Sequence, residues 1–171
     1  MNTLKSLKKL NKDILKSCKK YPLCKQCKNI VVGEGNIKAK IMLIGQNPGK
    51  EEDKTGRPFV GKSGKYLNKV LSKNKIKREE IYITSVVKCK TPNNRKPTQK
   101  EIEFFMPFLI KQIKLIKPKI IVLMGRVTLK TPIYKDIKYI KTYHPAAAMR
   151  FPKIKKKFEG DFKVLGRLNR K

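Results

Sequence analysis

Residues 41–49 read Ile-Met-Leu-Ile-Gly-Gln-Asn-Pro-Gly, a short apolar run that ends in a polar, turn-forming loop. An uninterrupted apolar run of this length is typical of a parallel strand that is buried on both faces. The loop contains two glycines, which permit backbone conformations closed to other residues, and a proline that fixes one dihedral angle. Ligands of open α/β sheets bind beyond the carboxyl ends of the strands, so Gln46 and Asn47 are candidates to face a binding site. For this motif taken alone, a simple turn is the more common explanation.

Length and composition indicate one globular domain over residues 1–171, since 39% of the chain is hydrophobic. No apolar stretch approaches the roughly 20 residues of a membrane span. Lysines interrupt the N-terminal leucines too often for a signal peptide. We therefore expect a cytoplasmic protein with no membrane partner.

The charge is strongly unbalanced, with 44 basic against 12 acidic side chains and a formal net charge of +32. Such a field attracts polyanions, because each phosphate that a cation neutralises releases condensed counterions. The excess also has a simpler explanation, since a chain so rich in Lys and Ile is what a biased genome would encode. We favour nucleic-acid binding.

Helical and strand periodicities alternate along the chain. Apolar residues recur at helical spacing over 3–16, and Thr98 and Glu101 have capping-box spacing ahead of an amphipathic helix to Ile116, which we expect Pro107 to kink. The other predicted elements are a turn at 33–36, strands at 40–45, 81–87, 119–124 and 137–142, and helices at 61–72 and 153–168. Strands separated by helical crossovers predict an α/β single domain with a central four-stranded parallel sheet flanked by helices on both faces.

His144 is the only histidine in the chain. It follows a predicted strand and precedes a proline and three alanines, which suit the start of a helix. A histidine in this place could donate a hydrogen bond to a substrate oxygen. With no ligand partner nearby, it is a poor candidate for a metal site, and a packed or surface histidine is the alternative.

Five blocks of sequence occur in a fixed order, at residues 33–36, 45–49, 52–61, 82–89 with 94–95, and 144–147. Together they resemble family 4 uracil-DNA glycosylases, the iron-sulfur type, and the resemblance spans nearly the whole chain. It implies a uracil-DNA glycosylase-like fold and a monomer. It also implies a reaction on DNA, in which uracil is flipped out and its N-glycosidic bond is hydrolysed to leave an abasic site.

The resemblance also assigns roles to individual residues. Phe59 would stack on the flipped base, and backbone amides around Gly45, Gln46 and Asn47 would meet the uracil carbonyl oxygens. His144 would donate a hydrogen bond to the oxygen that gains charge as the bond breaks. The residues Met149 and Arg150 resemble the loop that wedges into the duplex and contacts its strands.

Asn47 departs from the family 4 pattern, which usually has an acidic residue followed by Ala or Gly where this chain has Gln46-Asn47. The Gly-x-Asn-Pro-Gly form instead resembles the loop of the mismatch-specific and single-strand-selective glycosylases, whose Asn positions the attacking water. An amide is no strong base, but a dissociative mechanism asks mainly for orientation of the water. We assign Asn47 to this role.

Ser85 is a second departure, because the family has an Asn here that reads the uracil edge. A side-chain amide presents both a donor and an acceptor, whereas a hydroxyl is shorter and rotates to suit either need. We therefore expect a relaxed specificity that includes other deaminated or mispaired bases.

The cysteines are Cys18, Cys24, Cys27 and Cys89, and the resemblance implies that four cysteines hold a [4Fe-4S] cluster. Cys18 and Cys89 match family ligand positions, whereas Tyr21 and Phe105 occupy the other two, so Cys24 and Cys27 would be displaced ligands. Thiolates at this spacing suit iron-sulfur clusters and zinc equally well. We rank the cluster first, a tetrahedral zinc second, and free thiols with no metal third; a disulfide is not expected in the cytosol.

Two other classes of function stay open at this point. One is a non-catalytic basic nucleic-acid-binding protein on a glycosylase scaffold, which the charge and the altered pocket positions favour. The presence of Phe59, Asn47 and His144 together argues against it, since binding alone requires none of them. The other is a cluster-bearing electron-transfer protein, which gives no reason for the loop at 45–49.

Overall fold

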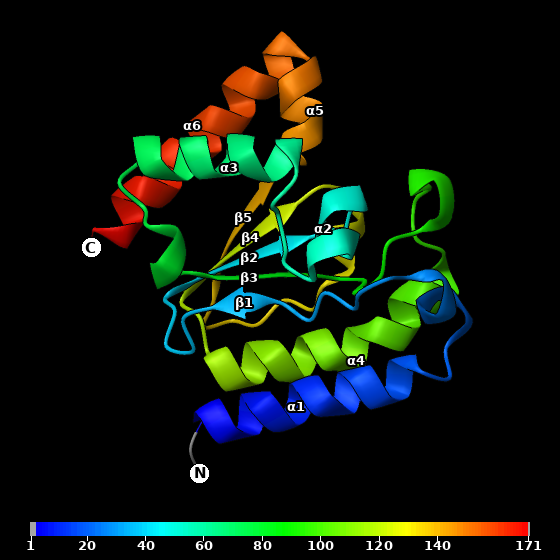
Figure 1. Cartoon of the computed structure of the whole chain (residues 1–171). Coiled ribbons are helices and arrows are strands. Elements are labelled where there is room, and N and C mark those ends of the chain that lie inside the picture. Colours follow the sequence, from blue (N-terminus) through cyan, green and yellow to red (C-terminus); the bar gives the residue numbers. More distant parts are fainter. Residues whose placement is uncertain (1–2, 171) are drawn as a thin grey trace.

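The apolar run forms the central strand, β2 (Ile41–Gly45), of a sheet with the order β1-β3-β2-β4-β5. The computed structural model of the protein describes residues 3–170 (Figure 1). Strand β2 pairs in parallel with β3 (Tyr82–Ser85) and β4 (Ile120–Met124), and β4 pairs in parallel with β5 (Lys138–Thr142). These four strands confirm the predicted parallel sheet.

The strand number was wrong by one, because the predicted turn at 33–36 contains a short fifth strand, β1 (Glu34–Gly35), that pairs antiparallel with β3. Gly35 has a φ of 128°, and a Cβ built on it would lie 2.0 Å from the carbonyl oxygen of Ile81. A glycine is therefore required for the backbones to approach this closely. Pattern reasoning recognised these glycines as a turn but could not show that the turn also pairs with the sheet.

Helices cover both faces of the sheet, as predicted (Figure 1). One face carries α1 (Thr3–Cys18) and α4 (Gln99–Ile116). The other carries α3 (Lys62–Lys73), α5 (Pro145–Arg150) and α6 (Pro152–Asn169). The short α2 (Lys50–Thr55) follows the loop after β2. Short 3-10 turns connect these elements at η1 (Pro22–Gln26), η2 (Arg78–Glu80), η3 (Pro92–Asn94) and η4 (Arg126–Lys130).

Successive side chains of β2 enter opposite cores. Met42 and Ile44 belong to the cluster beneath α1 and α4, whereas Ile41 and Leu43 belong to the cluster beneath α3 and α6. All four are at most 1% exposed. This alternation with a period of two explains why the strand needs apolar residues at every position.

The predicted helices agree with the observed ones to within two residues at the ends for which a boundary was predicted. The capping box is present, since the Thr98 hydroxyl accepts a hydrogen bond from the Glu101 amide at 3.2 Å, and the Glu101 carboxylate accepts one from the Thr98 amide at 2.7 Å. Helix α4 continues through Pro107 to Ile116. In residues 3–170, no helix is long and apolar enough to cross a membrane.

Candidate active site

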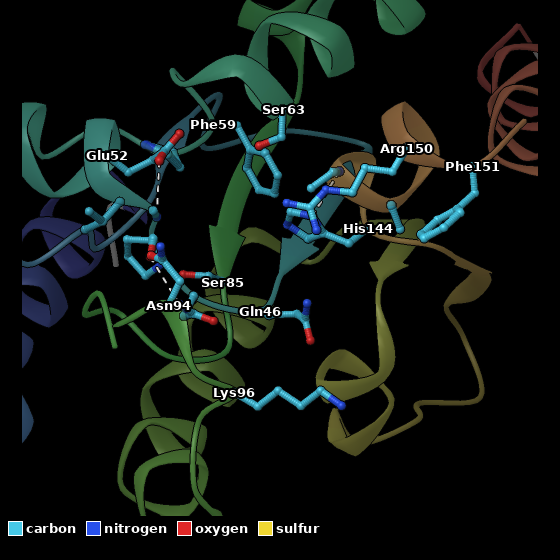
Figure 2. Close-up of a pocket in the computed structure, with 17 residues that line it drawn as sticks. Gln46, Glu52, Phe59, Ser63, Ser85, Asn94, Lys96, His144, Arg150 and Phe151 are labelled. Carbon is cyan, nitrogen blue, oxygen red and sulfur yellow. Dashed lines mark hydrogen bonds between the residues drawn. The ribbon is translucent and has the colours of Figure 1, made fainter. Parts of the chain in front are cut away.

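A cavity of about 590 Å³ lies at the carboxyl ends of β2 and β3, where the predicted site residues were expected. Figure 2 shows labelled side chains from separate loops and helices around this space. The lining residues are Val31, Gln46, Asn47, Pro48, Gly49, Glu52, Pro58, Phe59, Ser63, Ser85, Asn94, Lys96, His144, Ala146, Ala147, Arg150 and Phe151. The fold thus brings together segments that lie up to 120 positions apart in the sequence, from Val31 to Phe151.

Two predicted residues lie beside the cavity lining. Gly45 lies under the ring of Phe59, because a Cβ built on Gly45 would be 2.6 Å from the Phe59 Cζ atom. Met149 is on α5 with 48% of its surface exposed, next to the lining residue Arg150.

The ring of Phe59 forms one wall of the cavity. It is 7% exposed, and its centroid lies 5.8 Å from that of the His144 imidazole, with an interplanar angle of 30°. Its φ of 50° is left-handed, a conformation that costs a non-glycine residue about 1–3 kcal/mol. A Cβ on Gly64 would lie 2.0 Å from the Phe59 carbonyl oxygen, so helix α3 packs directly on this backbone.

Arg78 holds the strained segment in place. Its guanidinium donates to the carbonyl oxygens of Pro58 at 2.6 Å and Phe59 at 3.3 Å. It also donates to the Asn68 side-chain oxygen and to the Glu34 carboxylate, each at 2.9 Å. These contacts offset the cost of the left-handed residue and fix the direction of the ring.

Glu52 joins the two loops that form the pocket. Its Oε1 accepts hydrogen bonds from the amides of Val60 and Gly61, each at 2.8 Å, and its Oε2 accepts one from the Gly49 amide at 3.1 Å. The side chain is buried. The loop after β2 and the segment that carries Phe59 are therefore held to each other by one carboxylate.

His144 presents a neutral imidazole with a defined tautomer. It caps α5, and its Nδ1 accepts a hydrogen bond from the Ala146 amide at 3.2 Å. Burial lowers the pKa of His144 to about 4, against the opposing effect of the Glu52 carboxylate. Because Nδ1 acts as an acceptor, the proton of the neutral ring lies on Nε2, which is then a donor.

The hydroxyl of Ser85 has its proton committed within the protein. It donates to the Val87 carbonyl oxygen at 2.8 Å. A hydroxyl has one proton, so Ser85 can only accept a hydrogen bond from a group in the cavity.

The side chain of Asn47 donates from Nδ2 to the carbonyl oxygen of Pro48 at 3.1 Å and to the Thr91 hydroxyl at 3.4 Å.

The rim of the cavity combines cations with exposed apolar groups. Arg150 and Lys96 are exposed lining residues, and the Phe151 side chain beside them is 55% exposed. Cations and accessible aromatic rings are the two components of surfaces that bind unpaired nucleotides. In Figure 2, Arg150 and Phe151 lie on the α5 side of the space.

The cysteines of α1, η1 and the segment that follows β3 converge on one buried place. The sulfur atoms of Cys18, Cys24 and Cys89 lie within 4.8 Å of one another, and the Cys89 thiol donates to Cys24 at 2.9 Å. Hydrogen bonds from Cys24 and Cys89 lower the pKa of Cys18 to about 4, against burial and with help from the Lys88 cation. A hydrogen bond with Cys89 also lowers the pKa of Cys27, which is half-buried. This donor set suits a thiolate-ligated metal.

Tyr21 and Phe105, which the resemblance places at two ligand positions of the family, pack against each other. Their ring centroids are 6.0 Å apart in an edge-on arrangement, and Tyr21 also stacks on Phe104 at 3.7 Å. An aromatic cluster therefore fills these positions beside the thiols.

Lys88, next to Cys89, is fully buried. Its ammonium donates to the Thr84 hydroxyl and the Gln112 side-chain oxygen, each at 2.7 Å, and to the Ser85 carbonyl oxygen at 2.6 Å. Burial lowers the pKa of Lys88 to about 7, while the neighbouring Cys18 raises it. The lysine thus links the cysteine region to the strand end that carries Ser85.

Sequence reasoning missed several of these residues. Glu52 stands inside a quoted block, but only its three contacts show what it does. Arg78 and Thr91 carried no signal, since neither belongs to a periodic pattern or a motif with a chemical role. For Phe151, an aromatic residue directly before a proline in a basic segment was a usable sign of an exposed ring.

Comparison with known proteins gives a consistent family. Residues 32–165 match the model of the Uracil DNA glycosylase superfamily. A type-4 uracil-DNA glycosylase of Archaeoglobus fulgidus is 38% identical over 96% of this chain and 94% of its own length. Type-4 uracil-DNA glycosylases of Sulfurisphaera tokodaii and Thermotoga maritima are 41% and 40% identical, over 95% and 88% of this chain and 84% and 87% of theirs.

The state of His144 can be measured directly. We expect its imidazole to titrate near pH 4 in the folded protein, because burial disfavours the charged form. A proton NMR titration needs no assignment, since the chain has one histidine. A titration midpoint near the ordinary value of 6.5 would contradict the geometry.

The same shift makes stability depend on pH. Between pH 6.5 and about 4 the unfolded chain binds a proton at His144 that the folded chain does not, so the contribution of His144 falls as pH is lowered through this window. The lowered pKa corresponds to about 3 kcal/mol. Denaturant unfolding of His144→Gln should show a correspondingly weaker loss of stability over this range than the unsubstituted protein.

Proposed function

The chain belongs to the uracil-DNA glycosylase superfamily, and we propose that it is a DNA base-excision repair enzyme that flips uracil out of DNA and hydrolyses its N-glycosidic bond. The observation that carries the proposal is one cavity lined by Phe59, Asn47 and His144. An aromatic wall, a water-positioning amide and a neutral donor are the groups that this hydrolysis requires. The proposal includes a monomeric enzyme in the cytoplasm.

The base would be held by stacking and stabilised as it leaves. Phe59 offers its ring as the stacking surface, and backbone amides around Gly45 and Gln46 would meet the uracil carbonyl oxygens. As the bond from C1′ to the base breaks, its electron pair leaves with the base. Nε2 of His144 would donate to the base oxygen that gains charge, an interaction worth roughly 3–4 kcal/mol by analogy with oxyanion sites.

The attacking water would be oriented by Asn47. The water oxygen forms the new bond to C1′, and the proton that the water loses is released to solvent. Because the sugar acquires cationic character before the attack, orientation matters more than basicity. An amide at position 47 therefore suffices.

The DNA would be held around the flipped nucleotide by the rim. Arg150 and Lys96 would neutralise phosphates, and Met149 would wedge into the space that the base vacates. Phe151 would add a second exposed apolar surface beside the wedge. The net charge of +32 would support this contact over a wide surface.

The four cysteines would hold a [4Fe-4S] cluster, as the family resemblance implies. Their fit rests on three buried sulfur atoms that lie close together and a fourth, Cys27, that contacts Cys89. A bound cluster would act as a cross-link between the end of α1, the turn η1 and the segment after β3. A tetrahedral zinc would use the same ligands.

A non-catalytic nucleic-acid-binding protein is the second candidate function. The observation in its favour is Ser85, whose hydroxyl proton is given to Val87 and not to a base. A protein that only binds nucleic acid would need neither the strained backbone of Phe59 nor the neutral imidazole of His144.

The first prediction is excision itself. The unsubstituted protein should convert a uracil-containing oligonucleotide to an abasic product, and His144→Ala should lower the single-turnover rate about 10²–10³-fold. Asn47→Ala should also lower it. Val164→Ala changes an exposed apolar side chain on α6 and serves as the control. A folded protein that binds DNA but cuts nothing would support the second candidate instead.

A second prediction concerns base specificity. Ser85 can accept from a ring N–H, which uracil shares with hypoxanthine, xanthine and thymine. Ser85 would therefore make the same hydrogen bond to each of these bases. Their excision rates should lie within roughly tenfold of the rate for uracil, since a difference of one neutral hydrogen bond is worth about 1 kcal/mol. The measurement compares the excision rates of the unsubstituted protein and of Ser85→Asn on duplexes that carry each base. Cutting of uracil alone by the unsubstituted protein would rule out relaxed specificity.

A third prediction concerns the cysteines. Anaerobically purified protein should contain iron and absorb visible light, and Cys24→Ser and Cys27→Ser should each lose the metal. Tyr21→Phe and Phe105→Leu should keep it, because these positions no longer supply ligands. Zinc in place of iron would show that the cysteines form a tetrahedral zinc site. A protein without any metal would show that they are free thiols.

A further inference from the structure

Thr91 is a fully buried residue that contacts Asn47 from the loop after Cys89. Its hydroxyl donates to the Arg95 carbonyl oxygen at 2.5 Å. The oxygen of the Thr91 hydroxyl in turn accepts a hydrogen bond from Nδ2 of Asn47 at 3.4 Å. Neither the family resemblance nor any motif in the sequence gave this residue a role.

The two contacts together decide which way the Asn47 amide faces. A threonine hydroxyl has one proton, and here that proton is given to Arg95. Only lone pairs remain toward Asn47, so the NH₂ group and not the oxygen must face Thr91. The Pro48 carbonyl oxygen, 3.1 Å from Nδ2, imposes the same choice. Oδ1 of Asn47 has no hydrogen-bond partner in the described part of the chain.

We propose that Thr91 is a positioning residue that turns Oδ1 of Asn47 toward the attacking water. The inference rests on the proposed function and deepens it. An oxygen at this place accepts a hydrogen bond from the water O–H and leaves the lone pairs of the water oxygen free to attack C1′. An NH₂ group has no acceptor for the water O–H, and by donating to the water oxygen it would make that oxygen a weaker nucleophile.

The loop around Thr91 is held rigidly enough to serve this purpose. The amide of Asn94 donates to the Thr91 carbonyl oxygen at 3.2 Å, across the left-handed residues Asn93 and Asn94, with φ of 51° and 54°. The Arg95 side chain pairs with the buried Glu101 of the α4 capping box at 2.6 Å. The carbonyl that accepts from Thr91 is therefore fixed to the start of α4.

The test uses the symmetry of a carboxylate. Single-turnover uracil excision and DNA affinity are measured for Thr91→Val and Thr91→Ser, each alone and combined with Asn47→Asp. Thr91→Val alone should lower the rate about fivefold, the ratio that one neutral hydrogen bond supplies, with DNA affinity unchanged. Thr91→Ser should keep the unsubstituted rate. With Asn47→Asp, Thr91→Val should change the rate less than about twofold, because the carboxylate oxygens are equivalent.

A matched control is Thr128→Val. Thr128 is also fully buried, and its hydroxyl donates to the Gly125 carbonyl oxygen at 2.6 Å without contacting Asn47. It should leave the rate unchanged. An equal loss from Thr91→Val in both backgrounds would show a merely structural role and overturn the proposal.

The orientation can also be observed without a variant at position 91. In the unsubstituted protein, the Asn47 NH₂ protons, assigned by their loss in Asn47→Asp, should show a nuclear Overhauser effect to the Thr91 methyl group. Its absence would overturn the proposal even if Thr91→Val does not fold. If the protein excises no uracil, the proposed function fails, and this measurement still decides the orientation.

Discussion

The carboxylate of Glu52 is the constraint on which the pocket depends. It accepts amide hydrogen bonds from both the loop after β2 and the segment after Phe59, and no lysine or arginine forms an ion pair with it in residues 3–170. Backbone donors alone satisfy this buried charge in a chain of net charge +32. The same carboxylate acts on His144 through space. One side chain therefore holds the loop that carries Asn47 to the segment that carries Phe59.

The strands and the loop at 45–49 could be predicted because their signals are local. A buried parallel strand is apolar at every position, and its carboxyl end must carry the polar loop. The positions of Phe59 and Arg78 could not be predicted in this way. Their arrangement depends on a left-handed residue that is not glycine, which Arg78 and the backbone at Gly64 impose from distant parts of the chain. Strand β1 was missed because two paired residues carry no periodicity.

Most of the residues that the resemblance marks as departures from the family pattern contact one another in groups. Asn47 brings an amide with two distinct ends, and Thr91 supplies an acceptor that distinguishes them. Cys24 lies close to Cys18 and Cys89, and Cys27 contacts Cys89. Tyr21 and Phe105, which the resemblance places at two ligand positions of the family, pack edge-on against each other. Ser85 stands apart, since its hydroxyl bond to Val87 supplies nothing that replaces an edge-reading amide. The proposed relaxation of base specificity rests on this one residue.

A water held by Oδ1 of Asn47 is the central element of this account. The most direct measurement is a crystal structure of the protein with DNA that carries 2′-fluoro-2′-deoxyuridine, whose glycosidic bond resists cleavage. We predict a flipped uracil against Phe59 and a water about 2.8 Å from Asn47 Oδ1, on the side of C1′ opposite the base. A flipped base with Nδ2 of Asn47 facing C1′, or with no water between them, would contradict it.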